Sequence, residues 1–301
     1  MSDAIHDSTF DSNTNNTTHN DHGGVVDNPW RRLREFTDAR IGLGRTGISL
    51  PTAELLAFQL AHAQAKDAVH LVLDKKNLLE QLHTIPALDF SHAPFLLHSR
   101  APDRFTYLQR PDLGRQLDEP SRAQLARNNS AATPDDNITS PTPAYDLALV
   151  IVDGLSALAV QQNAAPFIDA LCAELAQDAQ PWKLAPLCIV EQGRVAIGDE
   201  TGELLNAHCV LVMIGERPGL SSPDSLGLYL TWAPHKGLTD AARNCVSNIR
   251  PAGLVYREAA KKAAYLLREA KRLGLSGVGL KDRTEDSLIE QHNEVRNFLL
   301  S

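Results

Sequence analysis

Two polar clusters in this sequence could take part in chemistry, and the first is the loop of residues 215–225. It follows the apolar run Cys209–Ile214, so Glu216 and Arg217 stand at the end of a segment that predicts a buried strand. A carboxylate at that place can accept hydrogen bonds from N–H groups of a ligand. The two charges could instead cap the strand while the Pro-Gly pair that follows makes a turn, because charged residues are common in loops.

The second cluster is Arg243–Pro251, which mixes polar side chains with the thiol of Cys245. A lone cysteine is most often a small buried hydrophobic residue, and no Cys-His-Asp spacing marks Cys245 as a nucleophile. The sequence also lacks the Gly-x-Ser-x-Gly turn of serine hydrolases, the Gly-x-x-x-x-Gly-Lys-Ser/Thr loop of nucleotide-binding proteins and any Cys-x-x-Cys pair. We therefore expect no catalytic residue and no metal ligand on this chain, which favours a binding subunit.

The elements that must position both clusters alternate between strand and helix after residue 145. Apolar runs predict strands at Asp146–Val152, Leu187–Glu191, Cys209–Ile214 and Leu228–Trp232, and a short strand at Val195–Ile197. Helical spacing predicts a helix after Ser156 that Pro166 interrupts, a short helix at Glu200–Asn206 and a long one at Tyr256–Leu273. This alternation predicts an α/β fold with a Rossmann-like, mostly parallel sheet flanked by helices. Ligands of such folds bind beyond the carboxyl ends of the strands, which directs attention to the loops 153–156 and 215–225.

Composition divides the chain into five segments. Residues 1–28 are polar and predict a disordered tail, whereas residues 29–118 predict a small N-terminal helical block with helices at Arg31–Arg40 and Ala53–Leu73. Residues 119–144 are rich in Ser, Asn, Asp, Thr and Pro and predict a disordered linker or insertion. Residues 145–282 form the predicted Rossmann-like domain, and residues 283–301 are a C-terminal extension with helical spacing.

Composition and charge exclude several classes of protein. Hydrophobic residues make up 43% of the 301 residues and charged residues 22%, which is typical of a globular protein. The net charge of −8 argues against a nucleic-acid partner, and no apolar run is long enough to cross a membrane. Residues 1–28 have no signal-peptide pattern and the four cysteines are widely spaced, so we expect a cytoplasmic protein with reduced thiols.

Seven short segments stand out in order along the chain: Thr37–Gly47, Phe58–Val69, Arg110–Arg115, Asp153–Ser156, Glu200–Glu203, Gly215–Leu220 and Cys245–Arg250. Together they resemble the small (light) subunit of ethanolamine ammonia-lyase. Each motif is short, but their joint occurrence from about residue 30 to residue 282 is highly specific. The chain therefore resembles this family over most of its length.

The resemblance implies a partner, a cofactor and a set of contact residues. Members of the family work with a large barrel-shaped subunit in a hetero-oligomer that uses adenosylcobalamin to convert ethanolamine to acetaldehyde and ammonia by a radical mechanism. The cofactor lies between the subunits, and the substrate reacts in the large one. By resemblance, residues 145–282 contact the cobalamin, and Val195, Glu216 and Cys245 are the contact residues. No catalytic side chain is expected on this chain, because the cofactor carries the chemistry.

The resemblance also bears on location. Some family members begin with an amphipathic helix that directs the enzyme into a bacterial microcompartment. Residues 1–28 show no such helical pattern, so a plain cytoplasmic enzyme is the expectation, with encapsulation left open.

Two alternatives come from other classes of protein. A nucleotide-binding, Rossmann-like oxidoreductase would need a glycine fingerprint after the first strand of the sheet, where the turn Asp153–Ser156 offers only one glycine. Gly42, Gly44 and Gly47 have the spacing of a phosphate-binding loop, but the residues before them are not typical of a strand. The other alternative is a scaffold subunit without a ligand.

Overall fold

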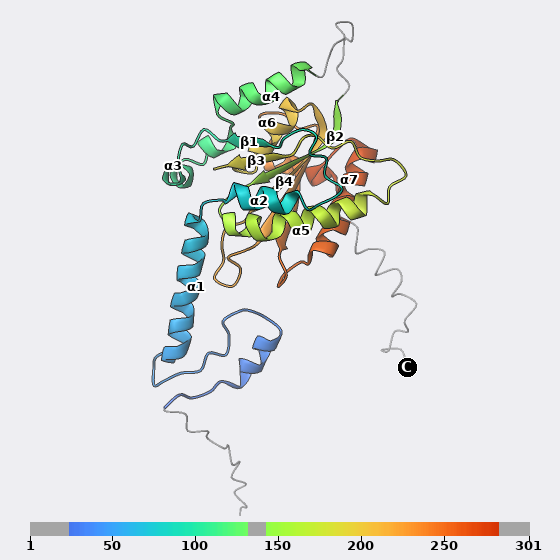
Figure 1. Cartoon of the computed structure of the whole chain (residues 1–301). Helices are drawn as coiled ribbons and strands as arrows, with labels where there is room; N and C mark the ends of the chain where they lie inside the picture. Colours follow the sequence, from blue (N-terminus) through green and yellow to red (C-terminus); the bar gives the residue numbers. More distant parts are fainter. Residues whose placement is uncertain (1–23, 132–142, 283–301) are drawn as a thin grey trace, which may run out of the picture. The chain divides into compact units, whose positions relative to one another are not determined.

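The computed structural model of the protein describes residues 24–131 and 143–282 (Figure 1). Within these residues the chain divides into two units, one ending at Leu60 and the other beginning at Ala61. The boundary falls inside a helix, α1 (Thr52–His70), so neither unit matches the segments that composition predicts. The predicted tail (1–28) lies outside the described residues up to residue 23, and the C-terminal extension (283–301) lies outside them entirely.

The first unit contains the 3-10 helix η1 (Pro29–Glu35), a turn-rich connection and the first part of α1. The side chain of Asn28 caps η1 by accepting a hydrogen bond from the N–H of Trp30 at 3.0 Å. Gly42, Gly44 and Gly47 all have positive φ, and the backbone around them makes isolated bridges rather than a strand followed by a helix. These glycines therefore allow the backbone to turn and do not form a phosphate-binding loop.

The second unit is built on a six-stranded sheet with the order β1-β3-β2-β4-β5-β6. The first four in this order are parallel: β1 (Phe95–His98), β3 (Cys188–Glu191), β2 (Tyr145–Val152) and β4 (Ala207–Gly215). The other two are antiparallel to their neighbours: β5 (Leu226–Trp232) and β6 (Arg243–Ile249). The sheet is thus mixed, and the prediction of a mostly parallel, Rossmann-like sheet is wrong in this respect.

Loop length explains the change of direction. A parallel neighbour needs a crossover of a dozen or more residues, usually with a helix. Residues 216–225 and 233–242 are the connections that precede β5 and β6, and both are too short for such a crossover. Each strand therefore returns beside the one before it.

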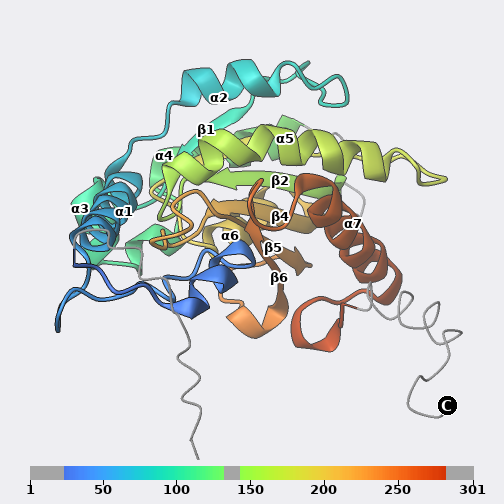
Figure 2. The ribbon, with the colours of Figure 1, turned by 90° about the horizontal axis from the view of Figure 1, so that it is seen from below.

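Helices cover both faces of the sheet. The strand β2 shows why, because Leu147, Leu149 and Ile151 belong to one apolar cluster and the residues between them to another. The first face is covered by α2 (Lys75–Leu82), α5 (Ala157–Leu175) and α7 (Tyr256–Leu273), and α5 and α7 lie side by side (Figure 2). The second face is covered by α4 (Glu119–Ala131) and α6 (Ile197–Leu204). Shorter elements are α3 (Arg104–Gln109), η2 (Leu113–Arg115), η3 (Asp240–Ala242) and η4 (Gly277–Gly279).

The helix α4 corrects the prediction of a disordered linker over residues 119–144. It begins at residue 119, and Asp118 accepts a hydrogen bond from the N–H of Ser121 at 2.9 Å in its first turn. Leu125 is fully buried in the apolar cluster of the second face. The linker prediction is therefore wrong up to residue 131, and residues 132–142 lie outside the described part of the chain.

Two other predicted elements differ from the structure. The segment 29–118 is not purely helical, because β1 within it pairs with β3 in the sheet. Residues 195 and 196 form a turn rather than a short strand, and α6 starts at Ile197. By contrast, the long helix α7 has the predicted limits. The predicted interruption at Pro166 is wrong, because α5 continues through this residue as one helix. In residues 24–131 and 143–282, no helix is both long enough and apolar enough to cross a bilayer.

Candidate functional site

The candidate site is a cleft at the edge of the sheet where β2, β3 and β4 end. Parallel strands place their carboxyl ends at the same edge, and β5 begins and β6 ends there as well. The cleft has a volume of about 440 Å³, within the range of small-molecule sites. Its lining residues are Tyr107, Leu155, Arg194, Val195, Ile214, Gly215, Glu216, Arg217 and Tyr229. Two of the three predicted cofactor contacts, Val195 and Glu216, are among them.

Glu216 is held in the cleft by the two antiparallel strands. Its Oε2 accepts hydrogen bonds from the hydroxyl of Ser225 and from the backbone N–H of Asn248, the latter at 3.2 Å. Its own N–H donates to the carbonyl oxygen of Ser225 at 2.9 Å. Its second carboxylate oxygen, Oε1, receives no hydrogen bond from the described residues. The carboxylate is therefore fixed in position and keeps one oxygen available to accept a hydrogen bond from a ligand.

The loop that carries Glu216 is anchored to α5. Ser156 caps this helix by accepting a hydrogen bond from the N–H of Ala159 at 3.2 Å, and its hydroxyl donates to the carbonyl of Pro223 at 2.8 Å. The buried Asn163 donates to the carbonyl of Asp224 at 2.7 Å. The turn at residues 153–156, which the sequence singled out, thus acts as a cap and as an anchor for the loop.

Val195 lies half-buried in the wall of the cleft, on the loop between β3 and α6. Asp153 holds this loop, because its carboxylate accepts hydrogen bonds from the N–H groups of Gln192 at 2.9 Å and Gly193 at 3.2 Å. Burial raises the pKa of Asp153 to about 6, although these hydrogen bonds and the guanidinium of Arg104, 3.9 Å away, act in the opposite direction. Asp153 thus links the end of β2 to the loop that bears Val195.

Tyr107 forms another part of the wall, between two guanidinium groups. The Cζ of Arg194 lies 4.1 Å from the centre of its ring and the Cζ of Arg104 lies 4.7 Å from it. The phenol donates to the carbonyl of Gly193 at 3.2 Å, and Arg194 donates to the carbonyl of Tyr107 at 3.1 Å. Burial raises the pKa of Tyr107, so the phenol stays protonated at neutral pH. These residues make α3 part of the site.

Cys245 does not line the cleft but lies one strand away from it. It is exposed on β6, directly opposite Tyr229 of β5, and Tyr229 does line the cleft. Its sulfur lies 3.2 Å from the hydroxyl oxygen of Ser247. Burial raises the pKa of Tyr229, and the neighbouring Cys245 acts in the same direction. The structure therefore brings Val195 and Glu216 together and places Cys245 beside the same surface.

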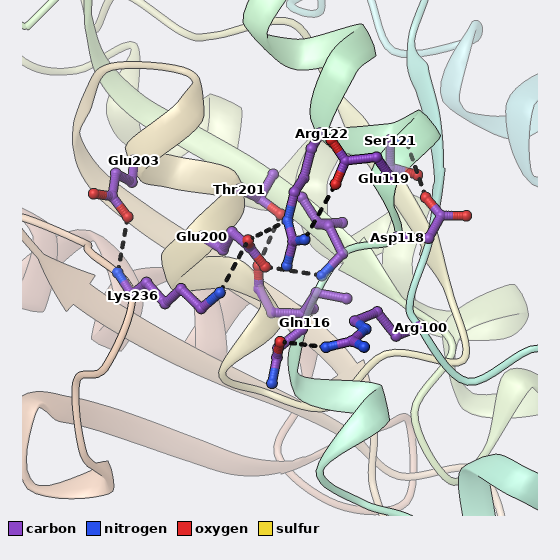
Figure 3. A network of polar contacts seen from close by, with 12 residues as sticks. Arg100, Gln116, Asp118, Glu119, Ser121, Arg122, Glu200, Thr201, Glu203 and Lys236 are labelled. Atoms are coloured by element: carbon purple, nitrogen blue, oxygen red, sulfur yellow. Dashed lines mark hydrogen bonds and ion pairs between the residues drawn. The ribbon is translucent and has the colours of Figure 1, made fainter.

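A network of charged side chains surrounds Glu200 in α6, the helix that follows Val195 (Figure 3). The buried carboxylate of Glu200 accepts hydrogen bonds from Arg122 at 2.6 Å and from the N–H of Leu117 at 2.8 Å. Lys236 lies 3.9 Å from the same carboxylate. These contacts join α4 and the segment before it to α6, so they hold the start of α6 in place.

Sequence reasoning missed Tyr107, Arg104 and Arg194. Only Arg194 could have been found from the sequence, because it stands directly before the predicted contact residue Val195. The other two come from a segment that precedes residues 145–282, and tertiary contacts alone bring Tyr107 to the cleft and Arg104 to the ring of Tyr107. In residues 24–131 and 143–282, no three His, Cys, Asp or Glu side chains are arranged to hold a metal ion.

Comparisons with known proteins match most of the chain to one family. The family model of the ethanolamine ammonia-lyase light chain matches residues 27–281. The ethanolamine ammonia-lyase small subunit of Ralstonia nicotianae is 57% identical over 276 residues, which cover 92% of this chain and 96% of the relative. The small subunit of Azotobacter vinelandii is 55% identical, covering 93% and 98%, and that of Pseudomonas putida is 53% identical, covering 91% and 96%. The matched region includes the cleft, α4 and the whole sheet, and the chain belongs to the ethanolamine ammonia-lyase light chain family.

Proposed function

We propose that this chain is the small subunit of an adenosylcobalamin-dependent ethanolamine ammonia-lyase and that it forms one wall of the cofactor site. The relatives are named as small subunits of this enzyme, which favours a large subunit as the partner in a hetero-oligomer. The observation that carries the proposal is the meeting of Val195 and Glu216 in one cleft. They come from different loops, and the same two residues are cofactor contacts by resemblance to the family.

The residues of the cleft suit one side of a large ring fringed with amides. Val195 offers an apolar contact, and the Oε1 atom of Glu216 can accept a hydrogen bond from an amide N–H. The guanidinium groups of Arg194 and Arg217 add N–H donors, and amide carbonyls or a phosphate can accept hydrogen bonds from them. The exposed Cys245 and the half-buried Tyr229 would extend this surface along β5 and β6. A cleft of 440 Å³ on one chain agrees with a site that a second chain completes.

The residues of this chain bind and orient rather than react. When bound, adenosylcobalamin supplies the radical chemistry that breaks the carbon–nitrogen bond of ethanolamine. Glu216 would fix the cofactor by accepting a hydrogen bond, and Val195 would exclude water from the neighbouring part of the ring. Asp153 would keep Val195 in place through the loop at residues 192–193. We assign no catalytic residue to this chain, and we propose a cytoplasmic location, in line with four free cysteines.

Co-expression with the large subunit of a close relative tests this function. The purified complex should release ammonia and acetaldehyde from ethanolamine only when adenosylcobalamin is added, and each subunit alone should be inactive. Equilibrium dialysis of cobalamin against the complex and against each subunit gives a second readout that is independent of turnover. A complex that forms but neither binds cobalamin nor deaminates ethanolamine would contradict the proposal.

A further inference from the structure

Arg243 and Asp199 form a buried ion pair in the second unit, between β6 and α6. Each of the two side chains is only 3% exposed. Arg243 is the first residue of β6 and stands two residues before Cys245, so both side chains lie on the same face of the strand. Asp199 is in the first turn of α6, four residues after Val195. The pair therefore joins the two segments that carry Val195 and Cys245.

The guanidinium of Arg243 also holds the connection between β5 and β6. Its Nη2 atom, which contacts Asp199, donates a hydrogen bond to the carbonyl of Leu238 at 3.2 Å. Its Nη1 atom donates to the carboxylate of Asp240, at the start of η3, at 2.7 Å. A guanidinium presents its donors in a rigid, planar fork. These contacts therefore fix the orientation of α6 relative to the start of β6 as well as the distance between them.

Two glycines let the backbone of α6 lie directly on the sheet. A Cβ atom at Gly198 would overlap the side chain of Val212, and one at Gly202 would stand 3.1 Å from Cβ of Val210. Both valines belong to β4, the strand that leads to Glu216. This close approach sets the height of the helix above the sheet. Its position along the sheet depends on side-chain contacts at its two flanks.

Each flank of α6 has one such contact. Glu200 binds Arg122 of α4 at 2.6 Å on one side, and Asp199 binds Arg243 of β6 on the other. Only the second contact reaches the strand that carries Cys245. The cleft itself extends from Val195 to Tyr229, the residue opposite Cys245 on β5. The Asp199–Arg243 pair thus connects the segments on both sides of the cleft.

This pair is a costly way to stabilise a fold. Two charges lose their hydration on burial, and their attraction offsets that loss only when the remaining polar atoms also find partners. The Oδ1 atom of Asp199 and the Nε atom of Arg243 are both buried, and neither has a hydrogen-bond partner among the described residues. Apolar side chains of similar volume are often at least as stable in such places. They do not supply a directional contact between one helix and one strand.

We propose that Asp199 and Arg243 are positioning residues of the cofactor site, because their buried pair sets the separation between the segment of Val195 and the strand of Cys245. This inference rests on the proposed function, since it takes Val195 and Cys245 as contacts of the cobalamin. Asp199 and Arg243 do not line the cleft themselves, so they act through the two segments that they join.

The test replaces the pair in the full chain, assembled with the large subunit of a close relative. The variant Asp199→Val/Arg243→Met removes both charges together and leaves neither partner unpaired. The control is Asp178→Val/Arg268→Met, because this ion pair, at 2.8 Å, joins α7 to the turn after α5 on the other face of the sheet. Equilibrium dialysis measures the Kd of cobalamin in the complex, and thermal unfolding measures the stability of the free chain.

The variant Asp199→Val/Arg243→Met should bind cobalamin roughly 10-fold or more weakly than the wild type, with a similar melting temperature. The control should keep the wild-type Kd. Val195→Ala should weaken binding less in Asp199→Val/Arg243→Met than in the wild type, because a displaced Val195 has already lost its contact. A purely structural role of the pair would lower the melting temperature and leave both binding results unchanged.

Three results would overturn the inference and leave the proposed function standing. They are a wild-type Kd in Asp199→Val/Arg243→Met, an equal loss of affinity in the control, and equal effects of Val195→Ala in both backgrounds. If Asp199→Val/Arg243→Met melts at a lower temperature, Arg243→Lys decides, because it keeps the charge and loses the planar fork. Arg243→Lys should weaken cobalamin binding, and a wild-type Kd would overturn the inference. A wild-type complex that binds no cobalamin would overturn the proposed function itself.

Discussion

Gly227 lies directly against the carboxylate of Glu216. A Cβ atom at Gly227 would stand 2.8 Å from Oε1 and 3.0 Å from Cγ of that side chain, closer than a Cβ contact allows. Gly227 is in β5, paired with Ile214 of β4, so its position is set by the sheet. The missing side chain at residue 227 therefore leaves the space in which the glutamate rests.

Gly227→Ala should displace the Glu216 carboxylate and weaken cobalamin binding in the assembled enzyme by roughly 10-fold or more. The clash involves the end of a flexible side chain, so the fold should be kept. Glu216→Ala should weaken binding by roughly 10–150-fold, because one hydrogen bond to a charged group is lost. The double variant should bind no more weakly than Glu216→Ala alone, since both changes remove the same contact. Additive effects, measured by titrating cobalamin, would contradict this account.

Asp153 should make the protein less stable as the pH rises from about 4 to about 6. Its pKa in the folded state is raised to about 6 by burial, above the usual value of 3.8, so the folded state holds the proton more tightly than the unfolded state. The stabilisation is fully present below pH 3.8 and is lost as the pH passes 6. A shift of this size corresponds to roughly 3 kcal/mol. Asp153→Asn should remove this component of the pH dependence, measured by urea unfolding from pH 4 to pH 7.

Asp146, near the other end of β2, provides the matched control for Asp153. Burial acts to raise its pKa, but hydrogen bonds from Lys183 and Lys271 prevail and the pKa is lowered. Its contribution to stability is therefore present above the usual pKa and is lost as the pH falls. Asp146→Asn should change the pH dependence with the opposite sign to Asp153→Asn. Equal signs for the two variants would refute the assignment.

Leu125→Ala should destabilise the protein by about 2–5 kcal/mol, the usual cost of removing a buried leucine side chain. The reason is that Leu125 is fully buried with Leu97 and Leu117 on the second face of the sheet. Ala126, its exposed neighbour in α4, provides a control, and Ala126→Ser should change stability by less than about 0.5 kcal/mol. If thermal unfolding showed no difference between the two variants, α4 would not be part of the core.

One of the four thiols should react rapidly with a thiol reagent in the native free chain. Cys245 is exposed, whereas Cys172, Cys188 and Cys209 are buried. Burial also raises the pKa of Cys172 to about 11, which suppresses its reactive thiolate at neutral pH. Denaturant should expose all four thiols, and Cys245→Ser should abolish the rapid phase. Bound cobalamin should slow the reaction in the complex if Cys245 borders the cofactor.

The parts of the fold that the sequence predicted are those with an unambiguous apolar pattern. The strands β2 and β4 are continuous apolar runs, and α7 has an apolar face with helical spacing along its full length. β6 was missed because more than half of its residues are exposed or half-buried, so its apolar pattern is weak. Residues 195–197 are a short apolar run, which fits a strand or the start of a helix equally well, and the helix α6 prevails there.

The candidate site was predicted only as far as local motifs reach. Glu216 follows a buried strand, so the sequence could place it at the carboxyl edge of the sheet, whereas Val195 was predicted to lie in a short strand and was named as a contact only by the resemblance. Tyr107 could not be assigned in this way, because its role depends on β1 pairing with β3, which brings the chain segment after β1 to the cleft. The linker prediction failed for a related reason: a polar helix needs only a few buried residues, and Leu125 alone gave a weak signal.

The two residues that donate hydrogen bonds to the carboxylate of Glu216 lie at different distances from it along the chain. Ser225 is nine residues away, whereas Asn248 is thirty-two residues away and arrives only with β6. During synthesis the carboxylate would therefore leave the ribosome well before the strand that completes its surroundings. Contacts that join distant parts of a chain form late, because the connecting loops must close first. Competence to hold a cofactor is thus acquired only after β6 has left the ribosome and paired with β5.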